Sequence, residues 1–150
     1  MNNPTLVIRP FDAAADTEAL ATLWLEASRI AHPFIGEQRL VEHQQLVREK
    51  YLPVAETWVA SFGYDPVGFI SLLDTYIGAL FVTPKRQGLG IGRKLIAHAL
   101  ARKGELSLEV YSRNKQAVRF YNALGFKEVS RRAEDDEGLP FENAFLRLTP

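Results

Sequence analysis

The chain has 150 residues, of which 47% are hydrophobic and 24% are charged, a composition typical of a folded globular domain. It contains no cysteine, which excludes disulfides, thiolate metal sites and a cysteine nucleophile. Eighteen Lys and Arg residues balance eighteen Asp and Glu residues, so the chain lacks the basic excess of a protein that holds a nucleic-acid backbone. We therefore expect one domain over residues 1–150 without a nucleic-acid partner.

The chain shows no targeting or membrane signal. The N-terminal segment lacks the basic and apolar regions of a signal peptide, and no apolar run reaches about 18 residues. We expect a cytoplasmic protein without a membrane partner.

The first half of the chain predicts one strand, two helices and three further strands. Asp16 is the expected N-cap of a first helix, whose apolar residues recur at helical spacing until Pro33. A weaker stripe predicts a second helix over residues 40–52, closed by Pro53. Runs rich in β-branched and aromatic residues predict the strands 5–11, 57–62, 67–73 and 76–82, with a hairpin turn at 63–66.

The second half adds two helices and three strands. A glycine cluster precedes a helix over residues 94–102 and a strand over 106–111. Asn114 is placed to cap a further helix, which Gly125 is placed to end. The last two strands are expected over 126–132 and 141–148, around the acidic loop 134–137. The expected order is β-α-α-β-β-β-α-β-α-β-β.

The most informative segment holds Gly88, Gly90 and Gly92, where a strand runs into a turn that opens a helix. Unpaired backbone N–H groups and the positive end of a helix dipole there suit a phosphate or pyrophosphate. A P-loop does not match, because Arg93 stands where its second glycine belongs and Leu95 where it needs Ser or Thr. A dinucleotide-binding fingerprint has its first two glycines but lacks the third, again at Arg93.

Two further patterns occur together in the second half of the chain. Residues 87–92 read Gln-Gly-Leu-Gly-Ile-Gly after a hydrophobic strand that ends in Pro84, and residues 114–126 read N-x-x-A-x-x-F-Y-x-x-x-G-F. Both are similar to signatures of the GNAT superfamily of acetyl-CoA-dependent N-acetyltransferases. The resemblance implies an α/β (α+β) fold with a mixed, mostly antiparallel central sheet flanked by helices. It also implies transfer of acetyl from acetyl-CoA to a primary amine of a small molecule or peptide.

The resemblance further implies where acetyl-CoA binds. Backbone amides around the glycine cluster are expected to hold the pyrophosphate, while the backbone of Phe81 and Val82 pairs with the pantetheine arm like an added strand. Gly78 predicts a bulge that opens a slot beside the strand 106–111. No metal is implied. The expected cofactor-binding residues are Phe81, Val82, Gln87, Gly88, Gly90, Gly92, Arg93 and Asn114.

Tyr121 is the expected general acid, because a phenol is protonated at neutral pH and can supply a proton to the departing thiolate. The identity of the general base stays open. Many members of the family use an acidic residue on the strand before the glycine motif, but residues 76–82 contain no carboxylate. Glu109, Asp74 and His32 are the candidates, beside deprotonation through ordered water.

The acceptor is the least defined part of the prediction. Residues 24–44 correspond to the helices that usually flank the acceptor site in the family, and the acidic loop 134–137 either attracts a cationic amine or is solvated surface. Without cysteine, direct attack by the amine in a ternary complex is favoured over an acyl-cysteine intermediate. The rival hypothesis is a non-catalytic acyl-CoA-binding or sensor domain. The chain is expected to be a monomer or a homodimer.

Overall fold

The computed structural model describes residues 5–150 and contains the predicted order of elements. The strands are β1 (Leu6–Pro10), β2 (Glu56–Phe62), β3 (Asp65–Leu73), β4 (Tyr76–Val82), β5 (Leu106–Tyr111), β6 (Lys127–Arg132) and β7 (Asn143–Leu148). The helices are α1 (Ala13–Ala31), α2 (Glu37–Leu46), α3 (Leu52–Val54), α4 (Ile91–Lys103) and α5 (Lys115–Ala123). The short turns are η1 (Pro33–Ile35), η2 (Val47–Tyr51) and η3 (Pro84–Arg86). The polar start of the chain, residues 1–4, lies outside the described residues.

The strands form one sheet in the order β1-β2-β3-β4-β5-β7-β6. Every neighbouring pair is antiparallel except β4 and β5, which are parallel. This arrangement confirms the mixed, mostly antiparallel sheet. β1 is an edge strand that ends at Pro10, a position where the missing N–H of proline costs no sheet hydrogen bond.

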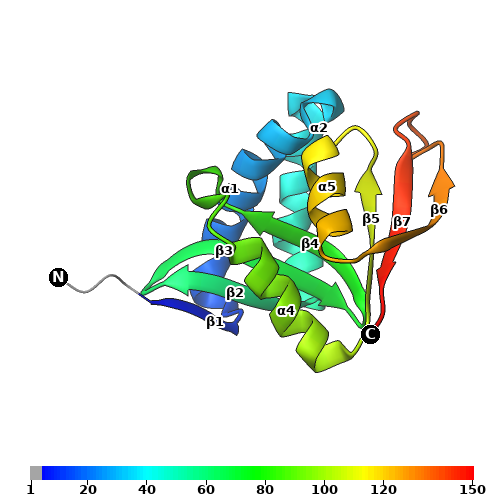
Figure 1. Ribbon diagram of the computed structural model, residues 1–150. Coiled ribbons are helices and arrows are strands. Elements are labelled where there is room, and N and C mark those ends of the chain that lie inside the picture. The colour runs from blue at the N-terminus through cyan, green and yellow to red at the C-terminus, as the bar shows by residue number, and fades with distance from the viewer. Residues whose placement is uncertain (1–4) are drawn as a thin grey trace.

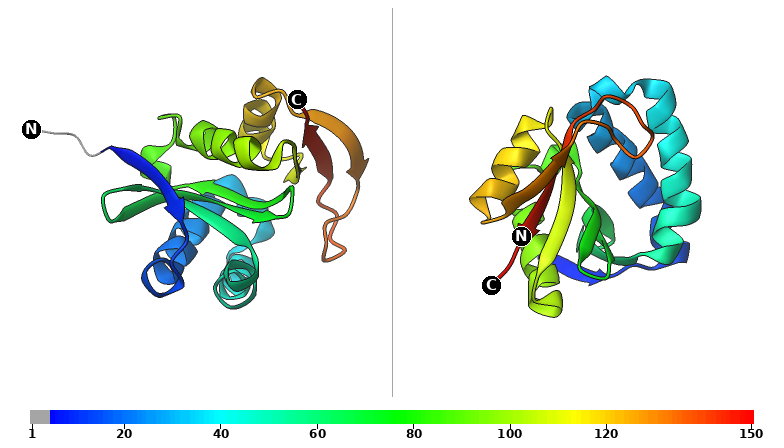
Figure 2. Two further views of the ribbon diagram at one scale, coloured as in Figure 1. Left: turned by 90° about the horizontal axis from the view of Figure 1, so that it is seen from below. Right: turned by 90° about the vertical axis from the view of Figure 1, so that its right-hand side faces the viewer.

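The helices cover both faces of the sheet (Figures 1 and 2). On one face, α4 packs on β2 to β5 and α5 packs on β5, through a core that includes Leu95, Leu108 and Tyr121. On the other face, α1 packs on β3 and β4 and α2 packs on α1, through a second core around Trp24 and Phe69. Within residues 5–150, no helix has both the length and the apolar character that crossing a membrane requires.

The first helix begins earlier than predicted. Asp12, not Asp16, is its N-cap, and the Asp12 side chain accepts a hydrogen bond from the Ala14 N–H (3.1 Å). Asp16 lies in the first helical turn, where it is buried and forms a two-pronged ion pair with Arg9 of β1 (2.7 and 2.9 Å). The prediction was wrong because this contact ties the helix to a strand, which local sequence cannot show.

The second helix has a composite end. The regular helix α2 stops at Leu46, and the chain continues through a π-helical turn, in which the Leu52 N–H donates to the Val47 carbonyl oxygen, into α3. Pro53 was predicted to close the helix but lies inside α3. A proline has no N–H to donate to the preceding turn, which favours a wide turn just before it.

The ends of α4 and α5 follow the expected capping chemistry. The helix α4 begins at Ile91, three residues before the prediction, so Gly92 lies in its first turn. Asn114 caps α5 by accepting from the Ala117 N–H (3.2 Å), as predicted. Gly125 follows the helix with φ of 99°, the left-handed conformation expected of a C′ glycine.

Candidate active site

An opening between β4 and β5 lies at the centre of the candidate site. The two parallel strands pair only at Tyr76 and Ser107, beyond which they diverge (Figure 1). On its other edge, β4 pairs with β3 through a register shift that places Leu72 opposite Ile77 and Ser71 opposite Ala79. Gly78 is thus the extra residue of a bulge, as predicted. The bulge bends β4 away from β5.

The strand register determines which backbone groups face this opening. The Thr83 N–H donates to the Val67 carbonyl on β3 (2.8 Å), and successive residues of a strand direct their N–H groups to opposite sides. The backbone of Phe81, paired with Phe69, therefore points toward β3. Val82 and Leu80 point toward the opening. Phe81 was expected to offer its backbone there, and Leu80 takes that place instead.

The glycine cluster forms the end of the opening. Gly88 and Gly90 have φ near 80°, and a Cβ atom at either would meet nothing within 4 Å. Gly90 caps α4 without a side-chain hydrogen bond, and the first N–H bonded back inside the helix is that of Lys94 (3.1 Å to Gly90). The preceding N–H groups, at residues 91–93, are the free donors of the helix start.

Close contacts fix both the loop before α4 and the start of this helix. The Gln87 side-chain amide donates to the Val82 carbonyl (3.2 Å), which ties the loop to the end of β4. A Cβ at Gly92 would lie 3.2 Å from the Phe120 ring of α5, so this glycine allows α4 and α5 to approach each other closely. Arg93 is exposed on the first turn of α4.

Tyr121 is buried on the α4–α5 face of the sheet. Its ring packs edge-on against Phe120 and Phe126, with centroids 5.2 and 5.3 Å away. Burial raises the pKa of Tyr121 far above the ordinary value. The phenol therefore stays protonated wherever the chain is folded.

Glu109 lies on the opposite face of β5. The residues on either side of it, Leu108 and Val110, are buried in the core under α4 and α5, so alternation directs Glu109 away from that core. Its carboxylate accepts a hydrogen bond from Arg132 Nε (2.8 Å). It also lines a hollow of about 340 Å³ with residues of β6 and β7, namely Ser130, Arg131, Arg132, Asn143 and Phe145.

His32 and Asn114 come together at the end of α1. The Asn114 amide lies 3.4 Å from His32 Nε2, and since an amide nitrogen only donates, Nε2 accepts and the ring proton is on Nδ1. The His32 ring also packs against Phe34 and Tyr111. Burial lowers the pKa of His32 to about 4, so the ring is neutral at physiological pH.

Asp74 lies apart from the other candidates. It occupies the tight turn between β3 and β4, at the opposite end of β4 from the glycine cluster. Its φ of 57° is left-handed, a conformation that aspartate tolerates better than most residues. Its position is explained by the turn.

The acidic loop is anchored to α2. Arg39 forms ion pairs with Glu137 (2.6 Å) and with Asp135 (3.8 Å), and His43 also contacts Glu137. Asp135 is buried and accepts hydrogen bonds from the N–H groups of Glu137 (2.9 Å) and Leu139 (3.0 Å). Asp135 is therefore paired inside the protein, whereas Glu137 is paired at the surface.

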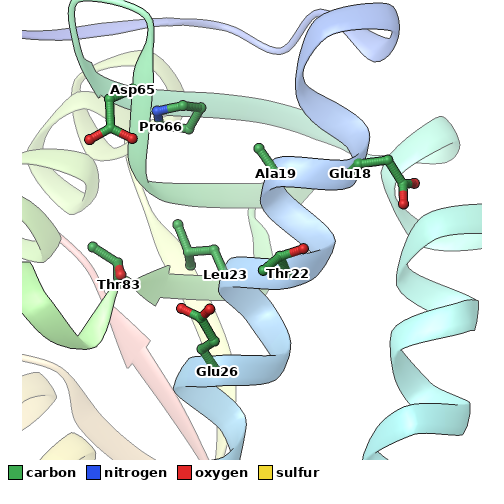
Figure 3. A pocket seen from close by; sticks show the side chains of 8 residues that line it. All are labelled: Glu18, Ala19, Thr22, Leu23, Glu26, Asp65, Pro66 and Thr83. Carbon is green, nitrogen blue, oxygen red and sulfur yellow. The ribbon is translucent and has the colours of Figure 1, made fainter.

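A second hollow, of about 410 Å³, lies between α1 and the end of β4 (Figure 3). Its carboxylates are Glu18, Glu26 and Asp65, of which Glu18 pairs with Arg48 (2.7 Å). No predicted site residue lines this hollow. Of the predicted residues, Val82 faces the β4–β5 opening and the glycine cluster lies at its end, whereas Asp74 lies at the other end of β4.

Comparison with known proteins agrees with this geometry. The acetyltransferase (GNAT) domain family matches residues 53–128. The peptidyl-lysine N-acetyltransferase YjaB of Escherichia coli (strain K12) is 40% identical over 125 residues, which are 83% of this chain and 84% of that protein. The chain belongs to the GNAT acetyltransferase family. It is an acetyl-CoA-dependent N-acetyltransferase, and the sensor hypothesis gives way to an enzyme.

Other relatives of this GNAT enzyme extend the comparison. The peptidyl-lysine N-acetyltransferase YiaC of Escherichia coli (strain K12) is 36% identical over 127 residues, 84% of this chain and 87% of that protein. The solution structure of apo YjaB from Escherichia coli superposes with a TM-score of 0.86 at 36% identity, over 95% of this chain and 97% of that one. The PaiA N-acetyltransferase of Thermoplasma acidophilum, solved with coenzyme A, shares the fold (TM-score 0.79, 20% identity, 97% and 99% covered).

The residues of the GNAT enzyme fit acetyl-CoA. The start of α4 offers N–H groups that no side chain caps, and the open Cβ positions of Gly88 and Gly90 leave the backbone accessible. Within residues 5–150, no strand pairs with β4 at Leu80 or Val82 on this edge, where the Val82 carbonyl accepts from the Gln87 side chain. Motif matching did not identify Leu80. Its backbone direction follows once the residues of β4 that hydrogen-bond to β3 are known, because backbone groups alternate in direction along a strand.

Proposed function

We propose that this enzyme acetylates the side-chain amine of lysine in a peptide or protein by direct attack of the amine on acetyl-CoA in a ternary complex. The observation that carries the proposal is the β4–β5 opening in a sheet that holds Tyr121 on one face and directs the Glu109 carboxylate to the other. An acid and a base on opposite sides suit an amine that enters from one side and a thiolate that leaves on the other. The substrate class comes from relatives 40% and 36% identical, both named peptidyl-lysine N-acetyltransferases.

Bound acetyl-CoA supplies an acetyl group activated as a thioester. We assign its pyrophosphate to the N–H groups at the start of α4, where Gly88, Gly90 and Gly92 keep the approach open and Arg93 and Gln87 stand beside it. We assign its pantetheine arm to the open edge of β4 at Leu80 and Val82, in the manner of an added strand. Asn114 combines helix capping with a position next to His32, at the carboxyl end of β5.

Tyr121 is proposed as the general acid. Its packing between Phe120 and Phe126 fixes the ring, and its raised pKa keeps the proton on the phenol until the thiolate forms. The same dry surroundings raise the pKa of the departing thiol, which brings the proton affinity of the thiolate closer to that of the phenolate. The phenol would stabilise the thiolate first by a hydrogen bond and then by its proton.

Glu109 is proposed as the general base. It stands two residues after Ser107, the last point at which β5 pairs with β4, and so flanks the start of the opening. Its carboxylate faces an open hollow that an amine can reach. His32 is a poor proton acceptor because its pKa is lowered to about 4, and Asp74 lies at the far end of β4.

The decisive experiment is a screen of amine acceptors with purified enzyme and acetyl-CoA. Thiol release is followed with lysine-containing peptides, with the same peptides carrying Nε-acetyl-lysine, and with small polyamines. We expect turnover only where a free lysine side chain is present, and a mass increase of one acetyl group on that lysine. Acetylation restricted to peptide α-amines or to small amines would overturn the proposed substrate class.

A further inference from the structure

Arg132 connects the Glu109 carboxylate to the acidic loop. Its Nε lies 2.8 Å from Glu109 Oε2 and 3.1 Å from Asn143 Oδ1, while its Nη2 lies 2.6 Å from Asp136 Oδ1. One guanidinium on β6 therefore contacts groups from β5, β7 and the loop between β6 and β7. The guanidinium is thus held at two of its nitrogens by separate partners, and it gives Glu109 one charge-assisted hydrogen bond from a fixed place.

Asn143 on β7 holds the Arg132 guanidinium in this position. In the sheet it is the partner of Tyr111 on β5 and of Arg132 on β6, so the three residues stand in one row across three strands. Asn143 is buried, and its amide donates to the Glu134 carbonyl (3.1 Å). Its side-chain oxygen is thereby turned toward Arg132 and holds the guanidinium beside Glu109.

The contact occupies one oxygen of Glu109 and leaves the other available. Oε2 accepts from Arg132, whereas Oε1 has no hydrogen-bond partner among residues 5–150. The carboxylate faces the hollow described above. A general base needs a fixed direction and an unoccupied oxygen within reach of the proton it takes.

We propose that Arg132 is a positioning residue for acetyl transfer, which orients the Glu109 carboxylate so that its free oxygen faces the incoming amine. The proposal rests on the function proposed above, with Glu109 as the base. Asp136 shares the guanidinium, so Arg132 is held in place by a second carboxylate and does not fold over Glu109. Arg132 touches no reacting atom and acts through Glu109 alone.

The test compares Arg132→Ala and Arg132→Lys with Arg48→Ala. Arg48 likewise binds a carboxylate through its Nε, that of Glu18 (2.7 Å), but it does not line the hollow beside Glu109. We expect Arg132→Ala to lower kcat about 10-fold while the KM for the peptide changes less than about twofold, because orientation rather than binding is lost. Arg132→Lys should recover part of the rate, and Arg48→Ala should match the parent enzyme.

A double mutant separates positioning from a general structural effect. Adding Arg132→Ala to Glu109→Gln should cause no further loss of kcat, because a residue that acts through Glu109 has nothing left to orient. A full additional loss in that background, or an unchanged kcat of Arg132→Ala alone, would overturn the proposal. Arg132→Gln and the melting temperature of each variant guard against misfolding.

The same set of variants distinguishes failure of the proposed function from failure of the positioning role of Arg132. If the parent enzyme acetylates no lysine peptide, the proposed function fails. If the parent is active and Glu109→Gln is equally active, the assignment of the base fails and the role of Arg132 with it. If Glu109→Gln is inactive and Arg132→Ala is not, only the positioning role fails.

Discussion

The Tyr121 ring is buried beside two aromatic rings, and replacing this residue is the most direct test of the proposed general acid. Tyr121→Phe removes one oxygen from a buried ring and leaves the contacts with Phe120 and Phe126 intact. We expect kcat to fall about 100-fold, the usual contribution of a general acid. Coenzyme A affinity and the melting temperature should stay near those of the parent.

Steady-state kinetics and calorimetric titration with coenzyme A measure these quantities. Unchanged turnover by Tyr121→Phe would mean that the thiolate takes its proton elsewhere. A parallel drop in coenzyme A affinity would instead assign Tyr121 to binding.

His32 makes folding stability depend on pH. Its pKa is lowered to about 4 in the folded chain from 6.5 as the ordinary value. Between these values the unfolded chain binds a proton that the folded chain excludes, so stability falls as the pH falls from about 6.5 toward about 4. Between pH 7.5 and pH 5 this linkage amounts to at most about 2 kcal/mol.

Urea unfolding of the parent and of His32→Gln at these two pH values measures the effect. Glutamine can still accept a hydrogen bond from Asn114 but does not titrate. We expect acidification to destabilise the variant less than the parent, by up to about 2 kcal/mol. Equal losses in the two proteins would show that the ring of His32 is freely protonated in the folded state.

The residues that sequence alone identified are those whose roles depend on local pattern. Asn114 could be predicted as a cap from its place before a helical stripe, and Gly125 from its place after one. Arg132 could not, because its partners Glu109 and Asn143 lie 23 and 11 residues away on other strands and meet it only in the folded sheet. Asp16 was misplaced as a cap for the same reason, since its partner Arg9 lies on a strand.

At the scale of elements, the two ends of α4 allow a controlled experiment on the cofactor site. Gly90 caps the start with φ of 80° and Gly104 caps the end with φ of 82°, and a Cβ atom added at either would meet nothing within 4 Å. Alanine at either position adopts a left-handed conformation at a cost of about 1 kcal/mol. Gly90→Ala and Gly104→Ala should therefore lose similar stability.

Only one of these variants should change the affinity for coenzyme A. An alanine at Gly90 places a methyl group at the free N–H groups that we assign to the pyrophosphate, whereas Gly104 is a whole helix away. We expect Gly90→Ala to weaken coenzyme A binding about 10-fold or more and Gly104→Ala to leave it unchanged, as measured by titration calorimetry. Equal affinities would remove the pyrophosphate from this helix start.

The strand β4 shows which features of an element can be predicted from sequence. One glycine among bulky residues was enough to predict the bulge at Gly78, because a bulge tolerates a missing side chain. Which residues of β4 direct their backbone groups toward the opening could not be predicted in the same way. Whether Phe81 or Leu80 faces the opening depends on which residues β3 binds, and the register shift at Gly78 changes that count by one.

At the scale of the whole molecule, the sheet consists of two parts that meet at one strand pair. β1 to β4 form one antiparallel set and β5, β7 and β6 form the other, with Tyr76 and Ser107 as the joining pair. The element order could be read from the sequence, because each element has its own periodicity. The insertion of β7 between β5 and β6 could not, since it depends on contacts between distant segments.

Arg39 is a further link, outside the sheet, between these two parts. It extends from α2, which is joined to the first set of strands through α1, to the loop that joins β6 and β7. The loop carboxylate of Asp135 is buried, and removing the arginine leaves that charge with fewer partners. Arg48, near the end of the same helical segment, pairs instead with the exposed Glu18 (2.7 Å).

Arg39→Met and Arg48→Met therefore remove the same charge from two environments. Methionine keeps much of the apolar stem, so the comparison isolates the ion pair. We expect Arg39→Met to lower the free energy of unfolding by about 2 kcal/mol, and Arg48→Met by less than about 0.5 kcal/mol, because an exposed pair is screened by water. Hydrogen exchange of Glu137 and Leu139, whose N–H groups bind Asp135, should accelerate only in Arg39→Met. Equal effects of the two substitutions would show that the loop is held by Asp135 and the sheet alone, without α2.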